Sequence, residues 1–100
     1  MLEDNGIENI YISIDLDVLD PTIAMGTSHY EAGGLNLREL FTLIKESMHF
    51  IMDSEYKLIG CDIVEYNPRN DINYLTGFIG SRLLRKVGSY MISLNETKYL

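Results

Sequence analysis

Two stretches of the chain have the apolar pattern of β-strands. Residues 9–15 place isoleucine at positions 10, 12 and 14, and β-branched side chains favour an extended backbone. The sequence therefore predicts a first strand over about residues 9–15, buried on both faces. Residues 56–64 predict a second strand, whose apolar body consists of Leu58, Ile59, Cys61, Ile63 and Val64.

Two further segments carry apolar residues at helical spacing. The first covers about residues 37–52, where Asn36 is a suitable N-cap and Glu39 completes a capping-box pattern. Its apolar stripe consists of Leu37, Leu40, Phe41, Ile44, Met48 and Ile51. The second helix ends near Leu94, and Asn70 or Asp71 can cap its start. Its stripe consists of Leu75, Ile79, Leu83, Val87 and Met91.

The order of these elements predicts the fold class. A helix that crosses between two strands makes them parallel, so we expect an α/β chain of βαβα order with a parallel sheet. Two strands and two helices are too few to cover both faces of a buried sheet. We therefore expect residues 1–100 to form a single partial domain. Its exposed sheet edge and apolar faces predict self-association or pairing with a missing part.

Acidic residues follow both predicted strands. Residues two apart on a strand point to the same side, so the carboxylates of Asp15 and Asp17 are expected to converge. Pro21 forces the chain out of the sheet, which places the pair at the carboxyl end of the strand, where open α/β sheets bind ligands. Glu65 follows the second strand and is expected at the same edge.

Two converging carboxylates need either a proton or a cation. At ~4 Å and an effective dielectric near 20 they repel each other by roughly 4 kcal/mol. Oxygen ligands favour hard divalent ions such as Mg²⁺ or Mn²⁺. A solvated pair of acids at a strand end is the alternative, and an isolated Asp-x-Asp does not decide between the two.

Composition and charge argue against several functional classes. The formal net charge is −7, and a protein that binds nucleic acid needs a basic surface. No stretch approaches the ~20 apolar residues of a membrane span. The single cysteine, Cys61, lies in an apolar run and is typical of a reduced thiol that packs as a small hydrophobe, which favours a cytoplasmic location.

Two motifs resemble the ureohydrolase family, which includes arginases, agmatinases, guanidinobutyrases and formimidoylglutamases. The first is SIDLDVLDP at residues 13–21, followed by Gly26-Thr27 and by EAGGL at residues 31–35. The second is DIVEYNP at residues 62–68. The resemblance covers roughly residues 7–94 and corresponds to the carboxyl-terminal part of such an enzyme.

The resemblance implies a three-layer arginase-like fold and a hydrolase that cleaves the C–N bond of a small cationic guanidino or amidino substrate with two Mn²⁺ ions. On this interpretation Asp15 bridges both ions and Asp17 binds one of them. Glu65 is the candidate catalytic residue and would bind the cationic nitrogens of the substrate. Thr27 matches a position beside the substrate.

Several of these residues also have a structural interpretation. For Thr27, turn chemistry is an equal alternative to substrate binding. For Glu65, the alternative is an ion pair with Arg69 or Arg82. Asp20 is expected to fix the turn before Pro21 rather than to take part in chemistry.

The loop of residues 16–36 departs from the family pattern. Met25 and Ala32 stand where prolines are usual, and His29 and Tyr30 replace a common Thr-Pro pair. The lost prolines imply a more flexible loop. A lone loop histidine typically faces solvent or bonds to backbone, so the sequence favours a non-ligating His29.

The family's remaining metal ligands come from a Gly-Gly-Asp-His block and an Asp-Ala-His-x-Asp block, and this sequence contains neither. We therefore expect the chain alone to bind Mn²⁺ weakly and to have no useful turnover without the amino-terminal part. One alternative is a non-catalytic remnant kept for interaction or oligomerisation. A Mg²⁺-dependent phosphate-handling domain is a further alternative, but the sequence has no glycine-rich phosphate loop of the P-loop kind.

Overall fold

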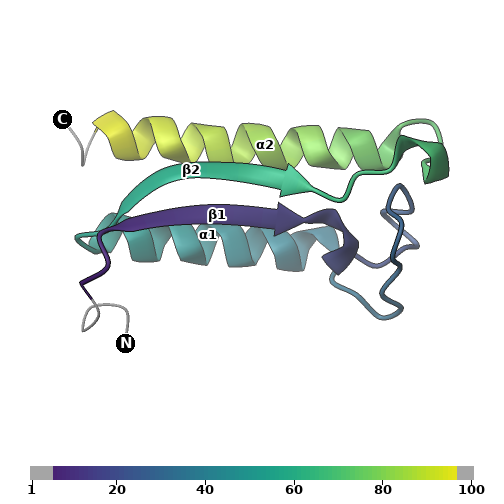
Figure 1. Ribbon diagram of the computed structural model, residues 1–100, viewed down its shortest axis with the longest axis horizontal. Coiled ribbons are helices and arrows are strands. Elements are labelled where there is room, and N and C mark those ends of the chain that lie inside the picture. Colours follow the sequence, from purple (N-terminus) through teal and green to yellow (C-terminus); the bar gives the residue numbers. More distant parts are fainter. Residues whose placement is uncertain (1–5, 97–100) are drawn as a thin grey trace.

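The computed structural model describes residues 6–96 and contains two strands and two α-helices within that range. Their order is β1 (Asn9–Asp15), α1 (Leu37–Asp53), β2 (Lys57–Val64) and α2 (Leu75–Leu94), as Figure 1 shows. Short 3-10 turns, η2 (Leu16–Val18) and η3 (Pro68–Asn70), follow the two strands. This order confirms the predicted α/β fold class. Neither helix in the described range has the length and apolar character needed to cross a membrane.

The two strands pair in parallel, as the crossover through α1 predicts. Asp15 lies opposite Val64 at the end of the ladder. The register shifts between Ile10 and Tyr11, and this irregularity leaves Ile59 without a register partner. Because both strands run the same way, the loops that follow them gather at one edge of the sheet, beyond the two arrowheads in Figure 1.

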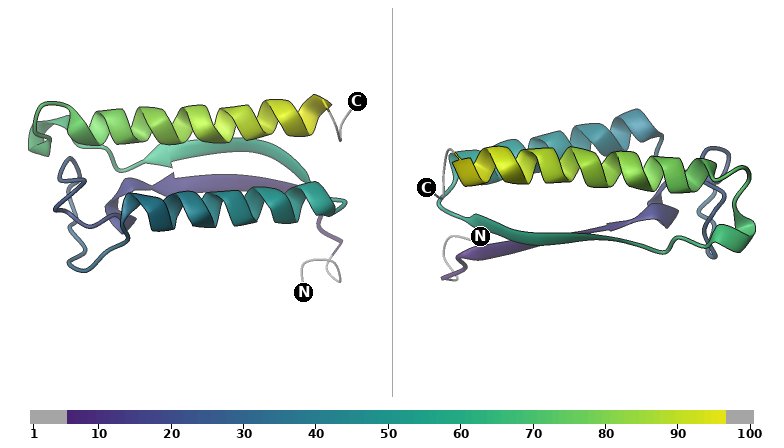
Figure 2. Two further views of the ribbon diagram at one scale, coloured as in Figure 1. Left: turned by 180° about the vertical axis from the view of Figure 1, so that it is seen from behind. Right: turned by 90° about the horizontal axis from the view of Figure 1, so that it is seen from above.

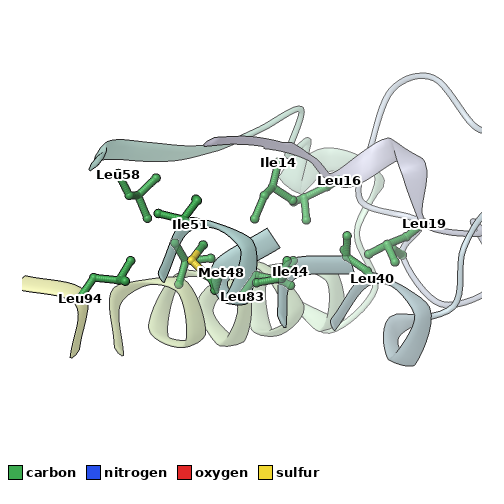
Figure 3. Close-up of a cluster of buried hydrophobic side chains, with 12 residues drawn as sticks. Ile14, Leu16, Leu19, Leu40, Ile44, Met48, Ile51, Leu58, Leu83 and Leu94 are labelled. Atoms are coloured by element: carbon green, nitrogen blue, oxygen red, sulfur yellow. The ribbon is translucent and has the colours of Figure 1, made fainter. Parts of the chain in front are cut away.

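Both helices lie on the same face of the sheet, and Figure 2 shows the opposite face uncovered in the described part of the chain. The core fills the space between the sheet and the helices (Figure 3). It consists of Ile14, Leu16, Leu19, Ala24, Leu40, Ile44, Met48, Ile51, Leu58, Leu83, Val87 and Leu94. Burial of each large aliphatic side chain contributes roughly 1.5–3 kcal/mol, so this shared core holds both helices on the sheet.

The predicted burial of the first strand on both faces was wrong. Ile14 points into the core, but Tyr11 and Ser13 point to the uncovered face, and Tyr11 is 54% exposed. The hydroxyl groups of Tyr11 and Ser13 donate to the carboxylate of Asp62 on β2, at 3.0 and 2.6 Å. Side chains alternate along a strand, so a sheet covered by helices on one side only leaves every second residue outside.

The capping box predicted for α1 is confirmed. The side chain of Asn36 accepts from the backbone N–H of Glu39 at 2.8 Å, and the Glu39 carboxylate accepts from the N–H of Asn36 at 3.0 Å. The predicted stripe of α1 is confirmed where Leu40, Ile44 and Met48 are buried.

The start of α2 differs from the prediction. The helix begins at Leu75, whose side chain is 48% exposed, because its first turn extends past the carboxyl end of β2 (Figure 1). The N-cap residue is Tyr74 rather than Asn70 or Asp71, but the Asp71 side chain still bonds to the first turn. The Asp71 carboxylate accepts from the backbone N–H groups of Thr76 and Gly77 at 3.0 and 3.1 Å. It thereby satisfies amides of the first turn that have no partner within the helix.

Candidate functional site

Asp15 and Asp17 lie together where β1 ends, but the strand does not hold both of them. Asp15 is the last residue of β1 and the N-cap of the η2 turn, and its Oδ1 accepts from the backbone N–H of Asp17 at 3.0 Å. The prediction that both residues belong to one strand face was wrong, because an aspartate that bonds to the amide two residues on closes a turn and ends the strand. The turn therefore brings Asp17 beside Asp15.

The carboxylates of Asp15 and Asp17 repel each other, as expected for two converging acids. Contact with the Asp15 carboxylate is the largest cause that raises the pKa of Asp17 above its ordinary value. Partial burial and the negative charges of Asp15 and Glu65 raise this pKa further, and His29 acts in the opposite direction. The ionised form of Asp17 is therefore disfavoured, and a proton or a cation relieves the repulsion.

Asp20 has the structural role expected from the sequence. Its Oδ1 accepts from the N–H and the hydroxyl of Thr22 at 2.9 and 2.6 Å. Its Oδ2 accepts from the N–H of Gly33 at 3.0 Å, which ties the two ends of the loop together. The hydrogen bonds from Thr22 lower the pKa of Asp20, so the turn stabilises the ionised form of this carboxylate.

Glu65 reaches the same edge from β2. It follows Val64, the register partner of Asp15. Its φ of 69° lies in the left-handed region, which is unfavourable for residues other than glycine. Within the described range no ion pair joins Glu65 to Arg69 or Arg82. The parallel strands thus bring Glu65 and Asp17 to one edge, as their position after each strand predicted.

His29 is the functional candidate that the sequence argument set aside. It is exposed, as a loop histidine is expected to be. One ligand atom each of Asp17, His29 and Glu65 lie within 4.8 Å of one another. Among residues 6–96 this is the one group of three or more potential metal-binding side chains, and Asp15 is outside it. One feature of the sequence could have indicated this role. His29 lies in the loop that follows the first strand, and this loop starts at the same edge as the end of the second strand.

Hydrogen bonds fix the loop that carries His29 against the segment after β2. The carbonyl of Gly26 accepts from the N–H of Asn67 at 2.6 Å, and the carbonyl of Thr27 accepts from the Asn70 amide at 2.7 Å. The amide of Asn67 also donates to the Ser28 hydroxyl at 2.9 Å. Residues 26–28 are therefore positioned by contacts with residues about forty positions further along the chain.

Close packing supports the same arrangement. The N–H of Gly26 donates to Thr76 Oγ1 at 2.8 Å, and a Cβ at Gly26 would lie only 2.8 Å from the Cβ of Thr76. Thr27 is 1% exposed. Its backbone carbonyl serves the loop contact, and a substrate role for its side chain stays a prediction.

The donor set suits a divalent cation. Carboxylate oxygens from Asp15, Asp17 and Glu65 and an imidazole nitrogen from His29 are groups that bind such ions in proteins. The Asp15 carboxylate raises the pKa of Asp17, so a positive charge at this position would be favourable. The edge of the sheet can therefore hold a cation and present a second carboxylate beside it.

Comparisons with known proteins agree with this geometry. The profile of the arginase family matches residues 2–89. The mitochondrial arginase of Medicago truncatula is 36% identical over 87 residues, covering 86% of this chain and 24% of the relative. The agmatinase of Halalkalibacterium halodurans is 39% identical over 79 residues, covering 79% of this chain and 26% of the relative.

The fold also matches solved structures. The arginase of Helicobacter pylori superposes with a TM-score of 0.74 at 26% identity, over 86% of this chain and 27% of that structure. The chain thus spans about a quarter of the length of the relatives that it matches.

Proposed function

The chain belongs to the arginase family, and on this premise we propose that it is part of a metal-dependent hydrolase that cleaves a guanidino or amidino C–N bond and releases urea. One observation carries the proposal: Asp17 and Glu65 lie close together where the two parallel strands end, and Asp15 lies beside Asp17. Relatives named as arginase and agmatinase support a small cationic substrate.

The proposed chemistry explains why acids are needed at this edge. The guanidinium carbon is resonance-stabilised and water is a poor nucleophile, and a pair of Mn²⁺ ions would supply a bound water of lowered pKa. Asp15 and Asp17 are the residues that would hold these ions. Their mutual repulsion supports this assignment, because divalent charge relieves it.

Glu65 is the proposed substrate carboxylate. A carboxylate accepts two parallel N–H bonds from a planar cation, so Glu65 can orient the guanidino group across from the aspartates. The left-handed backbone of Glu65 supports a positional requirement, since such a conformation is unfavourable for a non-glycine residue. Thr27 is proposed to line the substrate site, from the same loop as His29.

We propose that the chain alone is catalytically incomplete. It lacks the two histidine-containing motifs implied by the resemblance, and it spans about a quarter of its relatives. Residues 1–100 are then a partial domain, completed by an amino-terminal part that supplies the other ligands. Alone, the chain is expected to bind Mn²⁺ weakly and to release no urea from agmatine or arginine.

A chimera tests this function. This chain replaces the segment that it matches in the Halalkalibacterium halodurans agmatinase, and urea release from agmatine and bound manganese are measured. We expect turnover that falls about a hundredfold or more on D15N, D17N or E65Q. D53N, at the exposed end of α1, is the control and is expected to keep full activity. A folded, manganese-loaded chimera that keeps its activity after all three substitutions contradicts the proposal.

A second candidate is a non-catalytic remnant that acts by association. The exposed aromatic side chains at the start of α2 favour it, since Tyr74 and Phe78 are 72% and 68% exposed beside an apolar groove. Either function predicts pairing through these surfaces, and only the first predicts metal-dependent turnover in the chimera. We further propose a cytoplasmic location, supported by the unpaired Cys61.

A further inference from the structure

We propose that His29 is a metal ligand, and that Asp17, His29 and Glu65 together hold one divalent transition-metal ion. This goes beyond the proposed function, in which the aspartates hold the metal and Glu65 binds substrate. It uses Asp17 in the same role but does not require the chain to be completed or to be an enzyme. All three ligands belong to this chain, between residues 17 and 65.

The geometry brings three ligand types within reach of one ion. An oxygen of Asp17, a ring nitrogen of His29 and an oxygen of Glu65 lie within 4.8 Å of one another. Zinc binds imidazole nitrogen at about 2.0–2.1 Å and carboxylate oxygen at about 2.0–2.2 Å. The three side chains must therefore close by roughly 1 Å around the ion. His29 and Glu65 are exposed, so rotation of their side chains can provide this movement.

Hydrogen bonds on both sides of His29 fix the loop that carries it. On one side, the amide of Asn67 donates to the Ser28 hydroxyl at 2.9 Å. On the other, the Tyr30 hydroxyl donates to the carbonyl of Met25 at 3.0 Å, which closes the loop on itself. Asn67 lies two residues after Glu65, so the same segment that presents Glu65 also holds the residue before His29.

The mixed donor set selects the class of metal. An imidazole nitrogen with two carboxylates suits Zn²⁺, Co²⁺ or Ni²⁺, whereas an all-oxygen set suits Mg²⁺ or Ca²⁺. The two carboxylates neutralise a divalent charge, and the neutral imidazole adds affinity without repulsion.

The sequence contains a matched control. His49 is the second of the two histidines, and it lies exposed on α1 outside the group of ligands. A substitution there removes an imidazole of equal chemistry and leaves the site intact. H29A and H49A each remove one exposed imidazole, and only that of His29 lies within 4.8 Å of ligand atoms of Asp17 and Glu65.

The test is a calorimetric titration of the 100-residue chain with ZnCl₂, together with the absorption spectrum of the Co²⁺ complex. We expect one ion per chain, an affinity that falls about tenfold or more in H29A, and an unchanged affinity in H49A. The histidine NMR signals of residue 29 are expected to shift on Zn²⁺ addition, while those of residue 49 stay in place.

Two outcomes overturn the proposal. One is equal affinity of wild type and H29A, and the other is equal losses in H29A and H49A. A pattern in which D15N and D17N abolish binding while H29A does not would assign the ion to the aspartates, so this inference fails and the proposed function stands. The reverse result is Zn²⁺ binding that still depends on His29, together with a chimera whose urea release is unchanged by D15N, D17N and E65Q. In that case this inference stands and the proposed function fails.

Discussion

The Oδ1 atom of Asp15 accepts a hydrogen bond from the backbone N–H of Asp17 at 3.0 Å, and this bond closes the turn that ends β1. One carboxylate therefore has two duties, since its charge also raises the pKa of Asp17. The acceptor is needed for local structure, and the negative charge is needed for electrostatics. The two duties can be separated by substitution.

We predict that D15N keeps the turn and D15A loses it. Asparagine retains the side-chain oxygen but not the charge, so the fold is preserved and the pKa of Asp17 falls toward its ordinary value. Alanine removes the acceptor, which costs about 0.5–2 kcal/mol for an N-cap. Urea unfolding measures the stability, and carboxyl-carbon NMR titration measures the pKa of Asp17. An unchanged pKa in D15N would contradict the assigned cause.

A second prediction concerns Asp71 at the start of α2. Burial alone raises the pKa of its carboxyl, but hydrogen bonds from Thr76, Tyr66 and Gly77 outweigh burial and lower the pKa from 3.8 to about 2. A folded-state pKa below the unfolded value gives stability that is present above pH 3.8 and lost as the pH falls toward about 2.

We therefore expect D71N to be less stable than wild type at pH 7 by about 1 kcal/mol, because an amide oxygen can still accept hydrogen bonds but lacks the charge that strengthens them. The difference is expected to shrink between pH 4 and pH 2, since protonation removes the same charge from the wild type. Chemical unfolding followed by circular dichroism across this range measures both effects. D53N is the control, and an equal loss in D53N would refute a specific role for Asp71.

A third prediction contrasts two glycines. A Cβ at Gly34 would lie 2.7 Å from the Val18 carbonyl oxygen, at the isolated bridge between Leu19 and Leu35. Backbone atoms cannot give way, so G34A is expected to destabilise the chain by roughly 1–3 kcal/mol. A Cβ at Gly88 meets nothing within 4 Å, so G88A in the middle of α2 is expected to stabilise it by about 0.5–1 kcal/mol. Thermal unfolding of both variants checks the opposite signs.

How much the sequence could predict differs between the sheet and its loops. The bounds of β1 and α1 and the parallel pairing follow from periodicity and crossover, which are local properties. The end of β1 at Asp15 was predicted, but the bond from the Asp17 amide was not, because aspartate can either continue a strand or close a turn. The local pattern alone does not decide between these conformations.

The position of His29 depends on long-range contacts. Asn67 and Asn70 hold residues 26–28 through hydrogen bonds across about forty positions of sequence. No periodicity encodes such contacts. The sequence could therefore place the loop at the correct edge of the sheet, but it could not predict that His29 lies near Asp17 and Glu65. The uncovered sheet face also depends on the tertiary arrangement, since alternating isoleucines in β1 fit a strand covered on one side or on two.

The last prediction concerns association. Phe78 and Tyr74 are 68% and 72% exposed at the start of α2, and Ile59 is 60% exposed on β2. Exposed apolar side chains of this size favour contact with another protein surface. We expect the 100-residue chain to form oligomers at micromolar concentration and F78D to shift it toward the monomer, as measured by light scattering after gel filtration.

The substituted side chain makes this test specific. Phe78 lies outside the buried core, so F78D is expected to leave the unfolding midpoint nearly unchanged. L83D is the contrasting variant, because Leu83 is fully buried and its substitution is expected to unfold the chain. If F78D and wild type form the same oligomer at every concentration, the start of α2 is not the contact surface. Association then depends on the uncovered face of the sheet, and a charge at Ile59 becomes the substitution that reduces it.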